Sequence, residues 1–231
     1  MPQDFLDELA DVKAQVAAVA EMEHSSLGEF IRHEWAARAD SLLAGVVLSA
    51  ALPRADSPTQ RAARIHLATA MVLLDVALAL HKLLLLHRSD ADTLGKSLVG
   101  GTVLAGDYCF SQAAVAAART GNPRVVAIFS ELLKELSEAY LRRLFEDGQA
   151  TLNEFPVLFQ SGGLAGAVLA QLAETEQRDT AHFAASLAAH CGPGTGVEQN
   201  HLPALGSALA GRVADHQQPR WRAILGMAAS S

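Results

Sequence analysis

The segment from about residue 58 to residue 86 constrains the fold of this chain more than any other. Ser57 followed by Pro58 places a capping hydroxyl before a first-turn proline, a common way for a helix to begin. Apolar residues then recur with helical spacing, and in the second half of the segment they occupy nearly every face of the helix. Because a helix that is apolar all round must be covered on all sides, the sequence predicts a bundle wrapped around this segment.

The rest of the composition favours helices as well. Half of the residues are hydrophobic but only 5% are aromatic, and Ala and Leu predominate where a sheet protein would use Val, Ile, Thr and Tyr. No alternating strand pattern and no fixed-period repeat is visible, and nothing divides the 231 residues into compositional halves. We therefore expect one all-α domain over residues 1–231.

The predicted helices number about eight to ten. Capping residues, prolines and glycines bound them, as in the Gly121-Asn122-Pro123 break, which should end one helix and cap the next. The expected ranges are 4–23, 26–51, 57–86, 103–119, 125–145, 156–173, 176–190, 202–214 and 221–227.

Charge and cysteine content exclude several classes of function. The net charge is -7 without a basic stripe, so we expect no nucleic acid partner. Cys109 and Cys191 stand alone, which argues against a structural zinc site or a disulfide framework. The start of the chain is acidic, unlike a signal peptide, and the apolar stretch from Ala77 to Leu86 is interrupted by charge and too short for a membrane span. These features predict a soluble, cytoplasmic protein.

Two segments carry a resemblance to the all-trans polyprenyl diphosphate synthases. Residues 103–110 read VLAGDYCF and resemble the LAGDYLF segment of that family, with Gly106, Asp107 and Tyr108 as its turn motif. Residues 73–81, LLDVALALH, align without gaps with ELLHTASLVH, which precedes the family's first aspartate-rich motif, DDxxD. The resemblance extends over about residues 32–190. It implies an isoprenoid synthase-type helical bundle that surrounds an apolar cavity and is truncated at its carboxyl end.

The first aspartate-rich motif is degenerate in this chain. Its three positions correspond to Lys82, Leu83 and Leu86, none of which can bind magnesium. In the family the carboxylates hold Mg²⁺ against an allylic diphosphate, and this hard cation requires oxygen ligands. The sequence therefore predicts no metal and no cofactor bound by this chain itself.

The other diphosphate-binding elements are also reduced. The second aspartate-rich motif should follow the helix that ends near His190, but the chain there reads CGPGTG, and a helix cannot continue through Gly-Pro-Gly. By the same resemblance, the residual candidates for a diphosphate site are Arg38, Arg88 and Gln160, which stand where the family has its basic segment, its paired arginines and the lysine of its KTA motif.

The apolar cavity is the functional feature that the resemblance leaves in place. Leu74, Ala77, Leu78 and His81 are its candidate lining, because Ala77 and Leu78 align with the tunnel floor of the family. Ordinary core packing is the alternative for the apolar residues. For His81 we expect a buried, hydrogen-bonded side chain and no metal ligand, because its spacing from Asp75 places the two on different helix faces.

These observations favour a non-catalytic accessory subunit of a heteromeric trans-polyprenyl diphosphate synthase. The catalytic partner chain would bind Mg²⁺ and both diphosphates, and this chain would shape the tunnel for the growing isoprenoid. A homodimer is also possible. Two alternatives remain open, a stand-alone isoprenoid- or lipid-binding pseudoenzyme and an active prenyltransferase with unfamiliar ligands.

Overall fold

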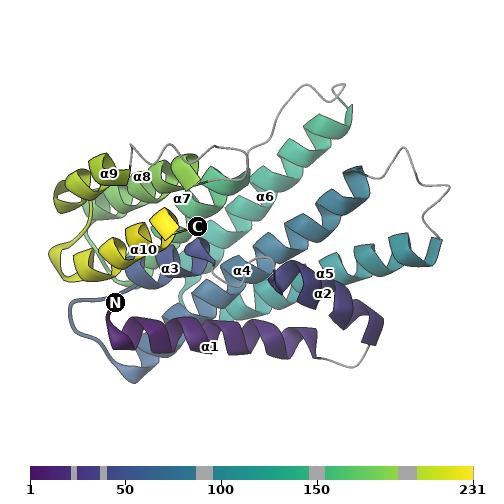
Figure 1. Cartoon of the computed structure of the whole chain (residues 1–231), viewed down its shortest axis with the longest axis horizontal. Coiled ribbons are helices and arrows are strands. Elements are labelled where there is room, and N and C mark those ends of the chain that lie inside the picture. The colour runs from purple at the N-terminus through teal and green to yellow at the C-terminus, as the bar shows by residue number, and fades with distance from the viewer. Residues whose placement is uncertain (22–24, 37–40, 87–95, 146–153, 192–201, 231) are drawn as a thin grey trace.

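The computed structural model describes residues 1–21, 25–36, 41–86, 96–145, 154–191 and 202–230, and this part of the chain is helical without any strand (Figure 1). The α-helices are α1 (Gln3–Ala20), α2 (Ser25–Ala36), α3 (Leu42–Ala50), α4 (Pro58–Leu86), α5 (Lys96–Arg119), α6 (Pro123–Phe145), α7 (Glu154–Leu169), α8 (Glu174–Cys191), α9 (Leu202–Ala208) and α10 (Gln218–Ser230). Two short 3₁₀ helices, η2 (Leu209–Gly211) and η3 (Asp215–Gln217), separate α9 from α10.

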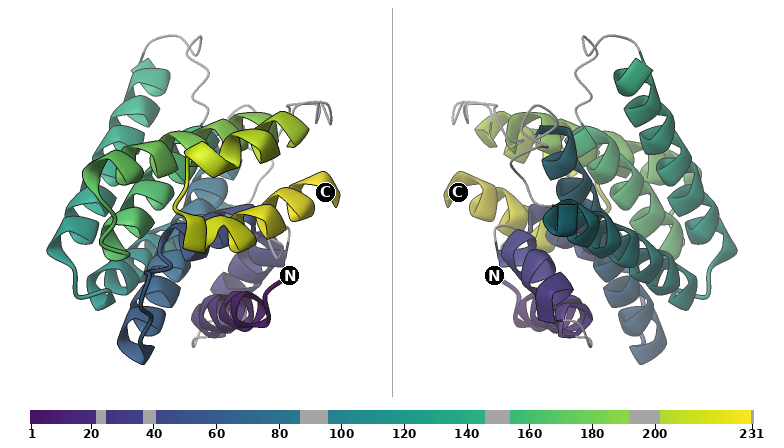
Figure 2. Two further views of the ribbon diagram at one scale, coloured as in Figure 1. Left: turned by 90° about the vertical axis from the view of Figure 1, so that its left-hand side faces the viewer. Right: turned by 90° about the vertical axis from the view of Figure 1, so that its right-hand side faces the viewer.

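Helix α4 lies at the centre of the bundle, as the sequence predicts. Its residues from 67 to 74 are almost completely buried on every face. Helices α1, α2, α3, α5 and α7 all contact it, and the views from the two ends of the molecule show α4 crossing between these helices (Figure 2). The uniform apolar character of α4 is therefore explained by its central position.

Two predicted helix boundaries are confirmed in atomic detail. The Ser57 hydroxyl accepts a hydrogen bond from the Gln60 backbone N–H at 3.2 Å and donates one to Gln60 Oε1 at 3.0 Å, which caps α4. Asn122 Oδ1 accepts from the backbone N–H of Arg124 at 3.0 Å and so caps α6. Gly121, with φ of +66°, turns the chain between α5 and α6.

The predicted helix over residues 26–51 is wrong, because two helices occupy this stretch. α2 ends at Ala36, and α3 begins at Leu42 behind Ser41, whose hydroxyl accepts from the Ala44 backbone N–H at 3.3 Å. The expected helix over 103–119 also begins earlier, at Lys96, and the one over 202–214 ends at Ala208 and continues as η2.

Glycines on α7 allow this helix to pack closely between α3 and α8. A Cβ atom on Gly166 would lie 2.8 Å from the Ala50 Cβ, and one on Gly163 would lie 2.9 Å from the Ala184 Cβ. Any larger side chain at either position would therefore push the neighbouring helix away.

By length and composition, residues Pro58–Lys82 of α4 could cross a membrane. The mean hydropathy of their most apolar window is 1.7, but 83% of that window is buried inside the bundle. This burial is typical of the core helix of a soluble protein.

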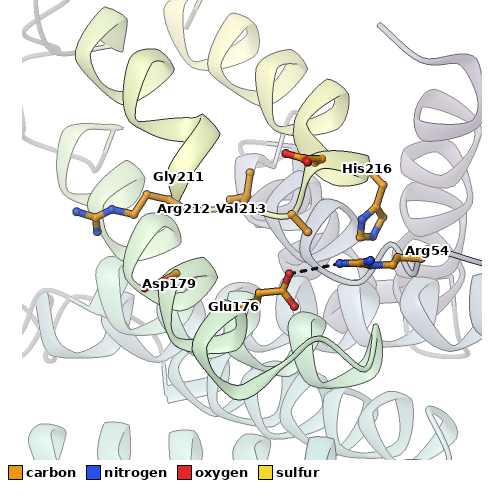
Figure 3. Close-up of a pocket in the computed structure, with 9 residues that line it drawn as sticks. Arg54, Glu176, Asp179, Gly211, Arg212, Val213 and His216 are labelled. Atoms are coloured by element: carbon orange, nitrogen blue, oxygen red, sulfur yellow. Dashed lines mark ion pairs between the residues drawn. The ribbon is translucent and has the colours of Figure 1, made fainter.

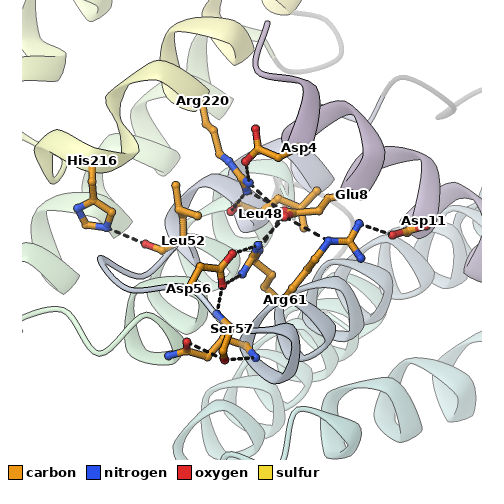
Figure 4. A network of polar contacts seen from close by, with 12 residues as sticks. Asp4, Glu8, Asp11, Leu48, Leu52, Asp56, Ser57, Arg61, His216 and Arg220 are labelled. Atoms are coloured by element: carbon orange, nitrogen blue, oxygen red, sulfur yellow. Dashed lines mark hydrogen bonds and ion pairs between the residues drawn. The ribbon is translucent and has the colours of Figure 1, made fainter.

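A buried carboxylate joins the two ends of the chain (Figure 4). Glu8 lies on the buried face of α1 and accepts hydrogen bonds from Arg64 Nε at 3.0 Å and Arg64 Nη2 at 2.5 Å. It also accepts from Arg220 of α10, through Nη1 at 2.7 Å and Nη2 at 3.1 Å. One carboxylate thus receives two guanidinium groups that are themselves 1% and 2% exposed.

Two further carboxylates, both partly exposed, bind the same two guanidinium groups. Asp56 accepts two hydrogen bonds from Arg64, both at 2.6 Å, and Asp4 accepts one from Arg220. These hydrogen bonds lower the pKa of Asp56 and of Asp4. Burial disfavours the charge on Arg64, but the hydrogen bonds from Arg64 to Glu8 and Asp56 outweigh it and raise its pKa.

The C-terminal segment is also tied to the end of α3. Gln217 donates from Nε2 to the carbonyls of Ala50 at 2.8 Å and Leu52 at 2.9 Å, and His216 Nε2 donates to the Leu52 carbonyl at 2.8 Å. Because the last carbonyls of a helix have no partner within the helix, these side chains stabilise both the end of α3 and the docking of α10.

Candidate functional site

The predicted tunnel residues of α4 lie inside the protein core. Leu74 and Ala77 are completely buried, and Leu78 is nearly so. Leu74 and Leu78 belong to the main core, whereas Ala77 shares a smaller cluster with Ala105 and Cys109 of α5. They line neither the pocket beside Arg54 and Glu176 nor the pocket beside Asp11 and Arg61. These side chains are packed in the core, and the tunnel that they would line stays an expectation.

His81 follows on α4 as a half-buried, hydrogen-bonded side chain. Its Nδ1 lies 3.0 Å from the Ala77 carbonyl, so this nitrogen donates, and its Nε2 lies 3.3 Å from Asp107 Oδ1 on α5. The ring also contacts Phe110, with the ring centroids 5.2 Å apart. The hydrogen-bonding that we expected for His81 is therefore present, although the side chain is 27% exposed and not fully buried.

The segment Gly106-Asp107-Tyr108 does not form the expected turn. All three residues lie within α5, and its backbone is helical throughout. Gly106 faces the imidazole ring so closely that a Cβ atom there would lie 2.6 Å from His81 Cε1. The glycine thus gives His81 the space to reach Asp107, and this close approach explains the Gly-Asp pair better than a turn does.

Lys82, at the first position of the degenerate motif, is engaged by an ion pair. Its Nζ lies 3.0 Å from Glu154 Oε2 at the start of α7. The Tyr140 hydroxyl of α6 donates a short hydrogen bond to the other oxygen of the same carboxylate. Phe155, next to Glu154, packs against Phe159 with ring centroids 4.5 Å apart and anchors the start of α7 in the core.

Of the remaining predicted site residues, the structure describes only the side chain of Gln160. Gln160 is exposed on α7. Leu83 and Leu86 lie in the last two turns of α4, but their side chains fall outside the described part of the chain, as do Arg38, Arg88 and the Gly-Pro-Gly segment after α8. Among the described residues, no three His, Cys, Asp or Glu side chains come together as a metal site.

Two large apolar side chains, Leu104 and Val115, are exposed on the outer face of α5. Leu104 is 59% exposed and Val115 is 44% exposed, and Tyr108 and Ser111 lie between them at helical spacing. Leu141 on the neighbouring α6 is also exposed. These side chains are accessible to a partner on the face of α5 that is turned away from α4.

A polar pocket of about 370 Å³ lies at the end of the bundle where α4 begins, between α8 and the segment before α10 (Figure 3). Arg54 and Glu176 face each other across it with 3.7 Å between Nη2 and the carboxylate. Asp179, Arg212 and Asp215 complete its charged lining, and His216 also lines it. Because charges of both signs are mixed and Arg54 is largely exposed, this pocket does not select for one class of ligand.

Two groups of interacting residues were missed by the sequence analysis. Glu154 and Tyr140 carry no motif, and 72 positions separate Glu154 from Lys82. Glu8, in contrast, had a visible signal. It lies three residues after Phe5 and four before Val12, on the apolar face of the first helix, where an unpaired carboxylate would be costly.

No protein-family model matches the sequence, and no curated protein matches it either. Solved structures do resemble it. A decaprenyl diphosphate synthase from Rhodobacter capsulatus superposes with a TM-score of 0.66 at 18% identity, covering 99% of this chain and 85% of the other. A heptaprenyl diphosphate synthase from Staphylococcus aureus superposes with a TM-score of 0.63 at 15% identity, covering 97% of this chain and 78% of the other.

A deletion mutant of the heterotetrameric geranyl pyrophosphate synthase from mint matches with a TM-score of 0.62 at 17% identity, covering 99% of this chain and 100% of that chain. The all-helical architecture predicted from the sequence is thereby confirmed. Since all these sequence identities are below 20%, the similarity shows the fold and does not show the activity. This chain has the isoprenoid synthase fold, at low sequence identity to the prenyl diphosphate synthases that share this fold.

Proposed function

We propose that this chain is a non-catalytic accessory subunit of a heteromeric trans-polyprenyl diphosphate synthase. The ion pair between Lys82 and Glu154 is the observation on which the proposal rests most. Where the resemblance predicts a metal-binding carboxylate, the chain has an ammonium group that is already paired across to α7.

The residues around Lys82 do not fit a magnesium ion. An ammonium group only donates hydrogen bonds and repels a cation, whereas Mg²⁺ takes several oxygen ligands in octahedral geometry. Glu154 alone, held by Lys82 and Tyr140, supplies one carboxylate that is already engaged. In this proposal Mg²⁺ and both diphosphates therefore belong to the catalytic partner.

The outer face of α5 supports the presence of that partner. Burial of apolar side chains of the size of Leu104 and Val115 lowers the free energy, and a matching surface on a second subunit would bury them. The mint enzyme with a similar fold is heterotetrameric, which supports a synthase chain as the partner.

In the assembled enzyme the buried stretch of α4 would form part of the wall that limits the product. Ala77 is the sharpest probe, because it has no exposed surface and packs against α5. Exchange for a larger side chain, Ala77→Leu, should shorten the isoprenoid product if the wall lies here. Product length is measured by chromatography of the dephosphorylated prenols, with Ala10→Leu on the exposed face of α1 as the control for the same exchange.

The decisive experiment is to purify this chain alone and with a synthase chain from the same host that has both aspartate-rich motifs. Elongation of an allylic diphosphate only by the mixture, together with a stable complex in size-exclusion chromatography, supports the proposal. Turnover by the isolated chain would instead identify an active prenyltransferase. A co-purifying lipid in the absence of any complex would indicate the stand-alone binder, and a self-associated chain without a partner would indicate a homodimer. A cytoplasmic location belongs to the same proposal and is checked by cell fractionation.

A further inference from the structure

The contacts at the C-terminal end of α4 point to a conformational device in addition to the proposed function. We infer that Lys82, Glu154 and Tyr140 form an electrostatic clamp that holds the ends of α4, α6 and α7 together without any bound ion. The three residues come from three different helices and meet at one carboxylate.

A clamp at this end of the bundle would hold together helices that diverge from one another. Helices α4, α5 and α6 diverge towards the side on which α4 and α6 end (Figure 1), and α7 contacts both α4 and α6. Glu154 stands in the first turn of α7, where the positive end of the helix dipole faces its carboxylate. Lys82 binds one carboxylate oxygen and Tyr140 binds the other, so the charge of Glu154 links all three helices.

The exposures of the two charged partners make the clamp asymmetric. Glu154 is 13% exposed, whereas Lys82 is 42% exposed. When Glu154 is neutralised, the Lys82 ammonium can turn into water at little cost. When Lys82 is neutralised, a mostly buried carboxylate keeps the Tyr140 hydroxyl as its described hydrogen-bond donor, and an uncompensated buried charge is the more costly defect.

Hydrogen exchange measured by mass spectrometry tests the clamp in the full-length protein. In Lys82→Met, amides in the last turn of α4 and the second turn of α7 should exchange about 3- to 10-fold faster than in the wild type, the range expected for loosening a partly buried ion pair. Glu154→Gln should have a smaller effect. The double variant should exchange more slowly than Lys82→Met, because removal of the buried charge relieves the defect.

The matched control is Glu131→Gln, which breaks the exposed pair between Glu131 and Lys134 within α6 and should leave exchange at α4 and α7 unchanged. Additive effects of the two clamp variants would overturn the inference, since side chains that only pack locally would not rescue each other. Protection of these helix ends that appears in the wild type only after addition of MgCl₂ would overturn it as well. Neither result depends on whether a synthase partner is found.

Discussion

Replacement of Glu8 by glutamine should be among the most damaging single changes in this protein. The substitution keeps the shape of the side chain but removes the charge shared by Arg64 and Arg220, which are both almost fully buried. Loss of one partner from a buried ion pair typically costs about 3–5 kcal/mol, because the remaining charge stays buried without compensation. Two guanidinium groups would be affected here, and the N–H groups of the glutamine amide would face the N–H groups of an arginine.

The opposite change, Arg220→Met, should cost less, about 1–3 kcal/mol, the loss expected for hydrogen bonds to a charged group. Glu8 would keep both hydrogen bonds from Arg64, and Asp4 is exposed enough to be hydrated. Because a domain of this kind has a free energy of unfolding of only about 5–15 kcal/mol, Glu8→Gln should remove a large share of it.

Urea unfolding followed by circular dichroism at pH 7 measures these differences. Asp7→Asn is the matched control, because Asp7 is exposed on the same helix and loses the same charge, so its cost should stay within about 0.5 kcal/mol. The double variant Glu8→Gln with Arg220→Met should be more stable than the sum of the single changes predicts. The reasoning is refuted if Glu8→Gln costs no more than Asp7→Asn, or less than Arg220→Met.

Three further outcomes follow from the described contacts. The pKa values of Asp4 and Asp56 in the folded chain lie below the ordinary value of 3.8. The stability that their ionised forms contribute is therefore complete above that pH and is lost on acidification below it. Between pH 5 and pH 2, the urea midpoint of Asp56→Asn should fall less steeply than that of the wild type. Gly106→Ala should destabilise the wild type by about 1–3 kcal/mol through its clash with His81 but stabilise a His81→Ala background through helix propensity, a reversal of sign measurable by thermal unfolding. Burial raises the pKa of Cys109 to about 12, so this thiol should react with iodoacetamide at pH 8 much more slowly in the folded than in the urea-unfolded protein, and equal rates would contradict the burial.

Local signals in the sequence were sufficient for most of the helices. The caps at Ser57 and Asn122 act within three residues, so their effect can be predicted without knowledge of the fold. The break between α2 and α3 was missed because residues 36–40, AARAD, contain mostly good helix formers. Ser41 carried the signal for a new helix, and its hydroxyl does cap α3.

The long-range pairs were outside the reach of such signals. Glu8 and Arg64 lie 56 positions apart in the sequence, and Glu8 and Arg220 lie 212 positions apart. The pattern of the first helix can show that Glu8 falls on an apolar face and must have a partner, but it cannot show which of the 18 Lys and Arg residues supplies it. That choice depends on the packing of α1, α4 and α10, which no local spacing encodes.

The region around His81 shows how far a motif can carry an argument about function. The alignment singled out Gly106 and Asp107, and the structure places both on α5 against His81 of α4, with 3.3 Å between Asp107 Oδ1 and His81 Nε2. The alignment assigned them the wrong conformation, because the need for a glycine arises from the His81 ring on the facing helix and not from the backbone of the segment itself. Lys82 gives the complementary case. The alignment shows that its ammonium cannot replace a metal-binding carboxylate, but only the contact with Glu154 shows what the ammonium does instead. Residue identity therefore limits the chemistry of a site, whereas the partner that a side chain meets across the bundle determines its role.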